Sequence, residues 1–521
     1  MASGLYSRLP VTGPLGPIVG LALLIYLIRQ ADRSQPIMKY FLSVLVRLVL
    51  FTLPILILNL NFLFAVPDHW PVPLVIYLSS GLWLFSQYWL WIFLGLGGRY
   101  ILATKLNIVG YSQRFPLYAG IACALFDIYF PPIMPRPWAV SYVVFAPFLY
   151  PMTIFSSSLY TFTTFWLANF LANWKENQLP AKITLCGYLL VLGLFSLKYP
   201  LAPPSVDTAP LSIKLVNQDY ELNITDSMSP EEKLTTLNRL NFKKQELIDL
   251  SVTNNPKSAD LVILAESAYT FEVPQSMVVI GDDFHDAAFR DGAKEMHSDM
   301  LIGTYLSQVE SNQTTGTNSA VLINREGKVA ARYDKRLLIP FFEGLGANLS
   351  GKIMGSVLGL KNLYHPGVND RALATSSHTP FIVLICYEIY FSDFVRDAIN
   401  KAANSQFIVN MSKDLLVTNT VAVEQMNAQI RIRAIEFQMP IVRSASFGPS
   451  GVFNRDGSYH VVNSSPDGVS AFDELKLAKQ TGSLFLTWGY APLLALFVLL
   501  ILIEVALYSV VARFKARPVD L

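Results

Sequence analysis

"PFIVLICYE", residues 380–388, is the stretch that decides the fold of the second half of this chain. An apolar run of strand length follows a proline and leads directly to a cysteine and a glutamate, as expected of a buried β-strand. Similar Val- and Ile-rich runs recur between residues 211 and 480, at "LSIKLVNQ", "ADLVILAE", "MLIGTYL", "SAVLINREG", "SQFIVNMS", "PIVRSAS" and "SGVFNRDG". Helical patterns at 230–250 and 420–438 alternate with these runs, so the sequence predicts an α/β layered domain over 211–480.

The composition places the chain among membrane proteins. Of its 521 residues 52% are hydrophobic, which is too apolar for a soluble protein of this length. The formal net charge of +2 gives no reason to expect a nucleic-acid partner. Its three scattered cysteines exclude a disulfide framework.

The apolar excess lies in residues 1–200 and near the C-terminus. A helix needs about 20 apolar residues to cross a hydrocarbon core. We therefore predict a transmembrane helical domain over 1–200 and a C-terminal transmembrane helix over 485–511, with seven or eight spans depending on how often 138–172 crosses. The first run resembles a signal peptide in length, but without a clear cleavage site it is interpreted as an anchor. The apolar runs are 15–29, 41–65, 72–97, 115–131, 138–153, 155–172, 183–199 and 485–511.

Charged loops between these runs predict the orientation. The loop "VPDHWPVP" contains neither Lys nor Arg, whereas the loops on either side of it are basic. Because Lys and Arg concentrate on the cytoplasmic side, the basic loops are expected inside and residues 211–480 on the outer face. The basic loop residues are Arg29, Arg33 and Lys39, followed by Arg99, Lys105 and Arg114.

Three reactive side chains stand at the ends of strand-like runs. Glu266 closes "LVILAE", Lys335 lies in "RYDKRLLIPFFE", and Cys386 closes "FIVLIC". A carboxylate can take the proton of a thiol, and a lysine can stabilise an oxyanion together with a backbone N–H such as that of Tyr387. Taken alone, each residue also has a structural interpretation, with Cys386 as a small apolar core residue.

No cofactor is expected from the sequence. A dinucleotide fingerprint, a phosphate-binding loop and zinc-ligand spacing are all absent. The six histidines show no metal-ligand spacing either, so no metal site is predicted.

Four motifs in order carry a specific resemblance. They are "LAES" around Glu266, "YDKRLLIPFFE" from Tyr333 to Glu343, "CYE" from Cys386 to Glu388, and "QIRIRAIEFQMPIVRS" over 429–444. With these motifs the chain resembles the apolipoprotein N-acyltransferases, the membrane branch of the nitrilase, or carbon–nitrogen hydrolase, superfamily. The resemblance covers 211–480 and the final apolar run, and is weaker over the N-terminal part.

The resemblance implies an α-β-β-α sandwich that carries a Glu–Lys–Cys triad. On this sequence Glu266 is the implied general base, Lys335 the stabiliser of the oxyanion and Cys386 the nucleophile. Glu343, Tyr387 and Glu388 are implied to support the site.

The resemblance also implies a reaction, partners and a location. Cys386 would take an acyl chain from a membrane phospholipid and pass it to the N-terminal amine of a diacylglyceryl-cysteine apolipoprotein. The location implied is the bacterial cytoplasmic (inner) membrane, with the catalytic domain on its periplasmic face. A thioester needs shielding from water, and the apolar loop after Lys335 would provide a lid through Phe341, Phe342, Met354 and Leu358.

The sequence departs from the family pattern at two loops. Residues 410–419 read "NMSKDLLVTN", without the family's aromatic pair, and residues 443–448 read "RSASFG". The family's tryptophan near 225–235 is also absent. These positions shape substrate pockets in the family, so two alternatives stay open. The first is an enzyme with other substrates, either a membrane-anchored amidase or an acyltransferase for another amine. The second is a non-catalytic nitrilase-like scaffold.

Overall fold

A computed structural model gives the fold of this chain. The residues that it describes are 18–19, 21–23, 25–26, 39, 42–43, 46–47, 50, 111–130, 138–175, 177–197, 211–216, 229, 231–232, 235, 248–249, 258–274, 287–310, 313–339, 343–344, 364–368, 371–402, 404–414, 420–446, 448, 450–462, 469–475 and 482–515.

The chain divides into two compact units. Unit 1 contains Met1–Pro203, Glu424–Phe437 and Gly482–Leu521, and unit 2 contains Pro204–Val423 and Gln438–Thr481. These boundaries differ from the predicted domain over 211–480 at one place. The predicted helix at 420–438 is present as α13 (Thr420–Phe437), but most of it belongs to unit 1, because Ile432 and Ile435 lie in the apolar core of that unit.

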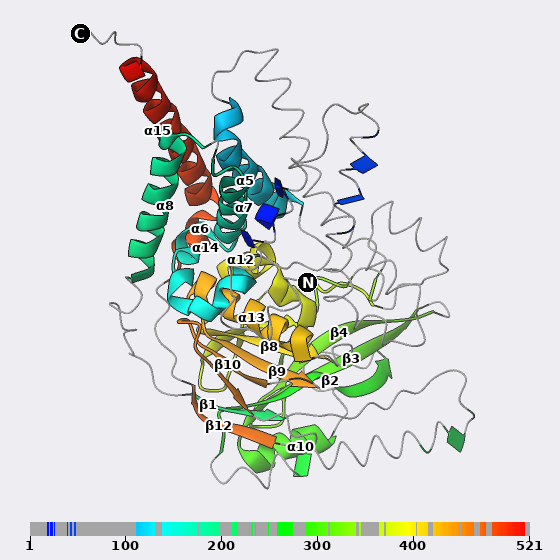
Figure 1. The fold of residues 1–521 in the computed structure, drawn as a ribbon. Helices are drawn as coiled ribbons and strands as arrows, with labels where there is room; N and C mark the ends of the chain where they lie inside the picture. Colours follow the sequence, from blue (N-terminus) through cyan, green and yellow to red (C-terminus); the bar gives the residue numbers. More distant parts are fainter. Residues whose placement is uncertain are drawn as a thin grey trace, which may run out of the picture. The chain divides into compact units, whose positions relative to one another are not determined.

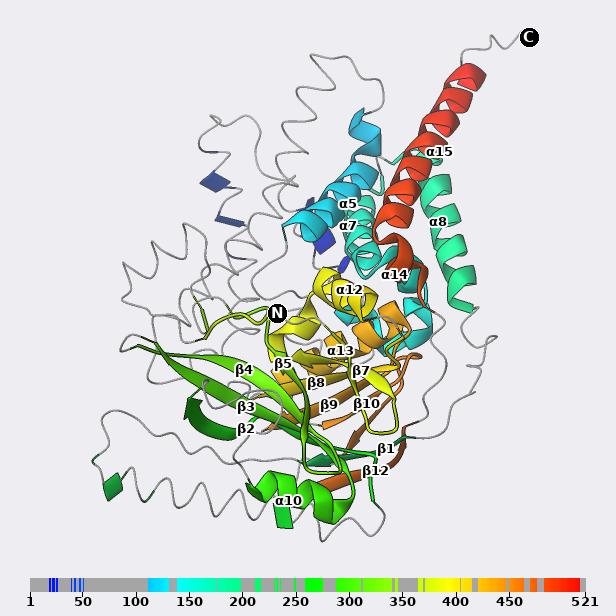
Figure 2. The ribbon, with the colours of Figure 1, turned by 180° about the vertical axis from the view of Figure 1, so that it is seen from behind.

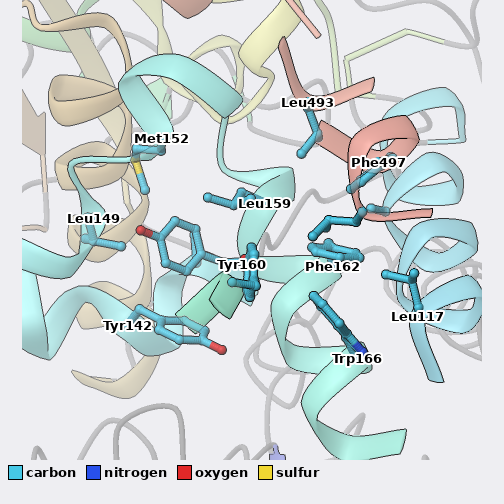
Figure 3. Packing of buried hydrophobic residues seen from close by; sticks show 14 of the residues in the cluster. Leu117, Tyr142, Leu149, Met152, Leu159, Tyr160, Phe162, Trp166, Leu493 and Phe497 are labelled. Carbon is cyan, nitrogen blue, oxygen red and sulfur yellow. The ribbon is translucent and has the colours of Figure 1, made fainter. Parts of the chain in front are cut away.

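Unit 1 is helical. Its core is aromatic: the rings of Phe162 and Phe497 lie 4.8 Å apart, and those of Trp166 and Tyr188 lie 5.0 Å apart. Figure 3 shows Phe162 and Phe497 facing each other in this core. Besides α13, its described helices are α5 (Tyr111–Tyr129), the 3-10 helix η4 (Trp138–Leu149), α6 (Met152–Phe155), α7 (Ser158–Ala172), α8 (Leu179–Leu197), α14 (Leu484–Trp488) and α15 (Ala491–Lys515).

The predicted membrane spans are tested only in part. Two helices of the described chain are long and apolar enough to cross a membrane, Leu179–Leu197 and Ala491–Phe514. The run at 138–153 is not one α-helix but η4 followed by α6. The run at 485–511 is interrupted at Gly489, whose φ of 57° ends α14.

Other predicted spans lie largely outside the described residues. The run at 72–97 is outside them altogether, as is 41–65 apart from single helical residues up to 50. The described residues within 15–29 are helical. The count of spans therefore stays a prediction.

The first sheet of unit 2 has the strand order β12-β1-β2-β3-β4-β5. Strands β1, β2 and β3 are parallel, and the remaining pairs are antiparallel. The strands are β1 (Leu211–Val216), β2 (Leu261–Pro274), β3 (Asp299–Glu310), β4 (Gln313–Ile323), β5 (Val329–Asp334) and β12 (Val469–Leu475).

The second sheet has the order β11-β10-β9-β8-β7-β6. Its central strands β7, β8 and β9 are parallel, so their carboxyl ends lie at one edge. After β7 come the 3-10 helix η7 (Cys386–Tyr390) and α12 (Ser392–Lys401). The strands are β6 (Leu373–Ala374), β7 (Pro380–Ile385), β8 (Phe407–Lys413), β9 (Ile441–Ser446), β10 (Ser450–Phe453) and β11 (Tyr459–Val462).

The two sheets of unit 2 pack face to face. A shared apolar core takes Ile213 and Ile263 from the first sheet and Val383 and Val409 from the second, all of them buried. The outer face of the first sheet is covered by α10 (Ala287–Met296), whose Phe289 is fully buried there. Figures 1 and 2 show these sheets as stacked layers with α10 beyond the first. The predicted α/β layered domain is confirmed.

The predicted strands are present, with one correction. The prediction that a strand ends at Glu266 is wrong, because β2 continues to Pro274. The pairing of β2 with β3 shifts register between Leu264 and Tyr269, so Glu266 lies at an irregularity within the strand. Strands β5, β6, β11 and β12 were not predicted.

Candidate active site

Cys386 follows directly after the last residue of β7. Its backbone has a φ of 49°, a left-handed conformation that costs a non-glycine residue about 1–2 kcal/mol. The turn is held from β8, because Asn410 donates its side-chain amide to the carbonyl oxygens of Leu384 (3.2 Å) and Cys386 (3.4 Å). Cys386 is partly buried and packs against the apolar core between the two sheets. Backbone strain of this kind persists where the surrounding structure imposes it, and it is frequent at active sites.

Lys335 is the first residue after β5 and is fully buried. Its Nζ lies 2.7 Å from Glu343 Oε1 and 3.5 Å from Glu266 Oε1. Its backbone is held on both sides, since its N–H donates to Asn318 O and its carbonyl accepts from the Gly367 N–H, both at 2.8 Å. A buried cation in contact with two carboxylates is thus fixed in one orientation.

Glu266 occupies the irregular part of β2 and is buried. Its Oε2 accepts the backbone N–H of Lys413 over 2.7 Å, and its Oε1 accepts the side-chain amide of Asn318 over 2.7 Å. The neighbouring strand comes unusually close: a Cβ at Gly303 would lie 2.7 Å from Glu266 Cα and 2.3 Å from Ala265 O. Only glycine at 303 permits this approach.

The two supporting glutamates have different surroundings. Glu343 Oε1 contacts Lys335, and its Oε2 accepts the Ile339 N–H over 2.8 Å. Glu388 is fully buried, and both of its oxygens accept hydrogen bonds. It accepts hydrogen bonds from the Tyr333 hydroxyl (2.8 Å) and from the backbone N–H groups of Ile385 (2.8 Å), Arg336 (2.7 Å) and Leu337 (3.0 Å).

The charges of the site are interdependent. Burial raises the pKa of the Cys386 thiol and the charge of Glu266 raises it further, whereas Lys335 lowers it. Burial also raises the pKa of Glu266, against the opposing charge of Lys335. Burial alone would lower the pKa of Lys335, but Glu266 and Glu343 raise it well above its ordinary value. The resting site therefore holds a charged lysine beside a thiol that is protonated until a base takes its proton.

The three residues singled out from the sequence are therefore brought together. Lys335 contacts Glu266 directly, and both act electrostatically on Cys386. The side chains of Phe341, Phe342, Met354 and Leu358, predicted to form a lid, lie outside the described residues. Within the described ranges, no group of three or more His, Cys, Asp or Glu side chains is placed to hold a metal ion.

A buried ion pair joins strand β9 to the residue that follows β8, within the two stretches, 410–419 and 443–448, that were predicted to be loops. Arg443 contacts Asp414, and both side chains are almost fully buried. Ser412 also donates to Asp414 over 2.7 Å. Both charges interact with Cys386. The charge of Asp414 raises the pKa of the Cys386 thiol, and the charge of an ionised Cys386 raises the pKa of Arg443. Sequence reasoning identified the two stretches but not this pairing, which joins residues 29 positions apart.

Comparisons with known proteins find similarity to the carbon–nitrogen hydrolases and to the apolipoprotein N-acyltransferases. Residues 241–469 match the family model of the carbon–nitrogen hydrolases. An apolipoprotein N-acyltransferase of Rhizobium rhizogenes is 26% identical over 274 residues, 51% of this chain and 48% of the relative. One of Haemophilus influenzae is 24% identical over 374 residues, 69% of this chain and 67% of the relative. A crystal structure of a carbon–nitrogen hydrolase from Helicobacter pylori G27 aligns with a TM-score of 0.33 and 15% identity, covering 50% of this chain and 88% of that one.

The family model and the two apolipoprotein N-acyltransferase relatives confirm the predicted resemblance. The matched part of the chain spans about half the length of the Rhizobium relative. Glu266, Lys335 and Cys386 all lie within residues 241–469, the part that matches the family model of the carbon–nitrogen hydrolases.

Proposed function

We propose that this divergent relative of the apolipoprotein N-acyltransferases transfers a fatty acyl chain from a membrane phospholipid to the N-terminal amine of a diacylglyceryl-cysteine apolipoprotein. The observation that carries the proposal is the contact of Lys335 with Glu266 beside Cys386. Similarity to proteins that bear this name supplies the choice of donor and acceptor. We assign Cys386 as nucleophile, Glu266 as general base and Lys335 as stabiliser of the oxyanion.

The first half of the reaction would form a thioester. Glu266 takes the thiol proton while the sulfur of Cys386 attacks the ester carbonyl, and the resulting oxyanion is stabilised by Lys335 Nζ and the Tyr387 backbone N–H. When the tetrahedral intermediate collapses, the C–O bond breaks and the proton held by Glu266 passes to the leaving alkoxide. A lysophospholipid departs, and the acyl chain stays on Cys386.

The second half would form the amide. The neutral α-amine of the acceptor attacks the thioester carbonyl and gives up one proton to Glu266. The C–S bond then breaks, and the leaving thiolate regains a proton from Glu266. The site returns to its resting state with no proton gained or lost overall.

A membrane location suits both substrates. A phospholipid donor and a lipidated acceptor are held in the bilayer, so an enzyme that joins them is expected to be a membrane protein. Leu179–Leu197 and Ala491–Phe514 are long and apolar enough to cross a membrane. We propose a multi-pass protein of the bacterial inner membrane with unit 2 on the periplasmic face, and a lid at Phe341, Phe342, Met354 and Leu358 that shields the thioester.

Intact mass spectrometry tests the proposed function. The purified protein is incubated with a defined phospholipid, and then with a diacylglyceryl-cysteine peptide, in parallel with Cys386→Ala. We expect one fatty-acyl mass on the wild type only, and its transfer to the peptide amine. Cys186→Ala is the matched control, since Cys186 is an exposed thiol in α8.

The same experiment separates the alternatives. If the acyl mass forms but is lost to water at the same rate with and without peptide, the protein is a hydrolase. If no phospholipid yields an adduct while small amides are cleaved, the amidase interpretation is correct. A protein that reacts with neither is a scaffold.

A further inference from the structure

Asn318 lies on β4 and contacts two glutamates of the site, although it belongs to none of the four motifs that carry the resemblance. It is fully buried, and on the neighbouring strand β3 it pairs with Tyr305. Its carbonyl oxygen accepts the backbone N–H of Lys335 over 2.8 Å. The backbone of Asn318 thus fixes the starting point of the lysine side chain.

The side chain of Asn318 contacts both carboxylates that flank Lys335. Its Nδ2 donates to Glu266 Oε1 over 2.7 Å and to Glu343 Oε1 over 3.3 Å. The same two oxygens face Lys335 Nζ at 3.5 Å and 2.7 Å. Each carboxylate oxygen therefore lies between an ammonium group and an amide group, which leaves neither glutamate free to rotate.

The orientation of the amide is determined by charge. If the amide were reversed, its oxygen would face two carboxylate oxygens, which is repulsive. In the observed orientation Oδ1 is buried without a hydrogen-bond partner among the described residues. A buried acceptor without a partner costs about 1–3 kcal/mol, so the contacts of Nδ2 are retained at a cost in stability.

We propose that Asn318 is a positioning residue of the reaction, which holds Glu266 ionised and aligned with Cys386 while Lys335 is shared with Glu343. The inference rests on the proposed role of Glu266 as general base. The Asn318 amide then acts together with the charges of Lys335 and Glu343 in determining when Glu266 is ionised and active as a base.

Electrostatics support this role. The hydrogen bond from Asn318 lowers the pKa of Glu266, whereas burial raises it. A donor to the ionised form of a carboxylate stabilises that form. Without Asn318, Glu266 would hold its proton to a higher pH, and fewer molecules would carry an active base.

The test is the pH profile of Cys386 acylation in the purified full chain. A 4-nitrophenyl ester of a medium-chain fatty acid is the probe, because its leaving group needs no protonation and its release is followed by absorbance. For Asn318→Leu and Asn318→Ser we expect the acid-side midpoint to move up by about one pH unit. Ser319→Ala is the matched control: its hydroxyl donates to Asp334 instead, so its loss lowers the melting temperature without moving the midpoint.

Each outcome decides one question. If either folded Asn318 variant keeps the wild-type midpoint, Asn318 has only a structural role and the inference is overturned. The serine variant is small, and its hydroxyl ends well short of the position of the Asn318 Nδ2, so it also removes the donor to Glu266 and tests the inference if the leucine variant does not fold. If the ester acylates Cys386 but no phospholipid does, the proposed lipid donor fails while the inference on Asn318 is still tested.

Discussion

Tyr333 donates its hydroxyl to Glu388 Oε2 over 2.8 Å, which joins the strand before Lys335 to the turn that contains Cys386. Each of the two residues stands two positions from a member of the proposed triad. Glu388 also accepts the N–H of Ile385, the last residue of β7. One buried carboxylate thereby links the segments that carry the lysine and the cysteine.

We expect Glu388→Gln to weaken this link. In the wild type each carboxylate oxygen of Glu388 accepts two hydrogen bonds. A glutamine amide has only one acceptor oxygen, so its NH₂ group must face the two donors that the other carboxylate oxygen served. The free energy of unfolding should fall by about 2–3 kcal/mol, and acylation should slow because Lys335 and Cys386 lose their alignment. Tyr333→Phe removes one of these bonds and should cost about 1 kcal/mol. Denaturation in detergent checks both, and equal losses would contradict this account.

The cation of Lys335 should matter to stability as well as to catalysis. Lys335→Met leaves Glu266 and Glu343 buried without their positive partner, so we expect a loss of about 3–5 kcal/mol. The double variant Lys335→Met with Glu343→Gln removes one of the uncompensated charges and should recover part of that loss. Thermal melting of the wild type, Lys335→Met, Glu343→Gln and the double variant gives the coupling free energy between the two side chains. Additive losses would show that the charges do not interact as the distances indicate.

The left-handed backbone at Cys386 predicts an unusual order of stability for two variants at this position. Glycine adopts a φ of 49° without a Cβ clash, whereas alanine does not. We therefore expect Cys386→Gly to be more stable than Cys386→Ala by about 1 kcal/mol, although glycine is usually the less stable of the two. Both variants should lack the acyl-enzyme. A more stable alanine variant would mean that the turn relaxes.

The close approach of Gly303 to β2 predicts a loss of activity from a single methyl group. In Gly303→Ala the new Cβ would meet Ala265 O and Glu266 Cα, so the strand that carries the base must shift. A displacement of about 1 Å should slow acylation about a hundredfold. Gly187→Ala is the control, because nothing lies within 4 Å of its new Cβ. Single-turnover rates compare them, and a fully active Gly303→Ala protein would be evidence against Glu266 as base.

The rate of acylation should depend on pH in a specific direction. Glu266 acts as a base only when ionised, and its pKa lies above the ordinary 4.5 because of burial. The rate should therefore fall on the acid side with a midpoint above pH 4.5. Lys335 keeps its proton because its pKa is raised, so it should cause no loss on the alkaline side. A midpoint at or below the ordinary value would mean that another group is the base.

Much of unit 2 could be predicted because its strands have a local sequence signature. The Val- and Ile-rich runs that form β7, β8 and β9 can be recognised without knowing which strands they pair with. The position of Cys386 directly after β7 follows from the same pattern. The strand β12 was missed, because it pairs at the sheet edge with β1, more than 200 residues away in sequence.

The sequence alone determined which residue types stand at the ends of apolar runs, and through its motifs it indicated a thiol, a lysine and a carboxylate acting together. Only the tertiary structure decided how they meet. Asn318 and Glu266 are 52 positions apart, and their contact depends on the register of β2, β3 and β4, including the irregularity that Gly303 permits. Hydrophobic periodicity is a local property, whereas sheet register is the joint result of packing along the whole domain. For that reason Glu266, Lys335 and Cys386 could be singled out from the sequence, and the amide of Asn318 that contacts the two glutamates could not.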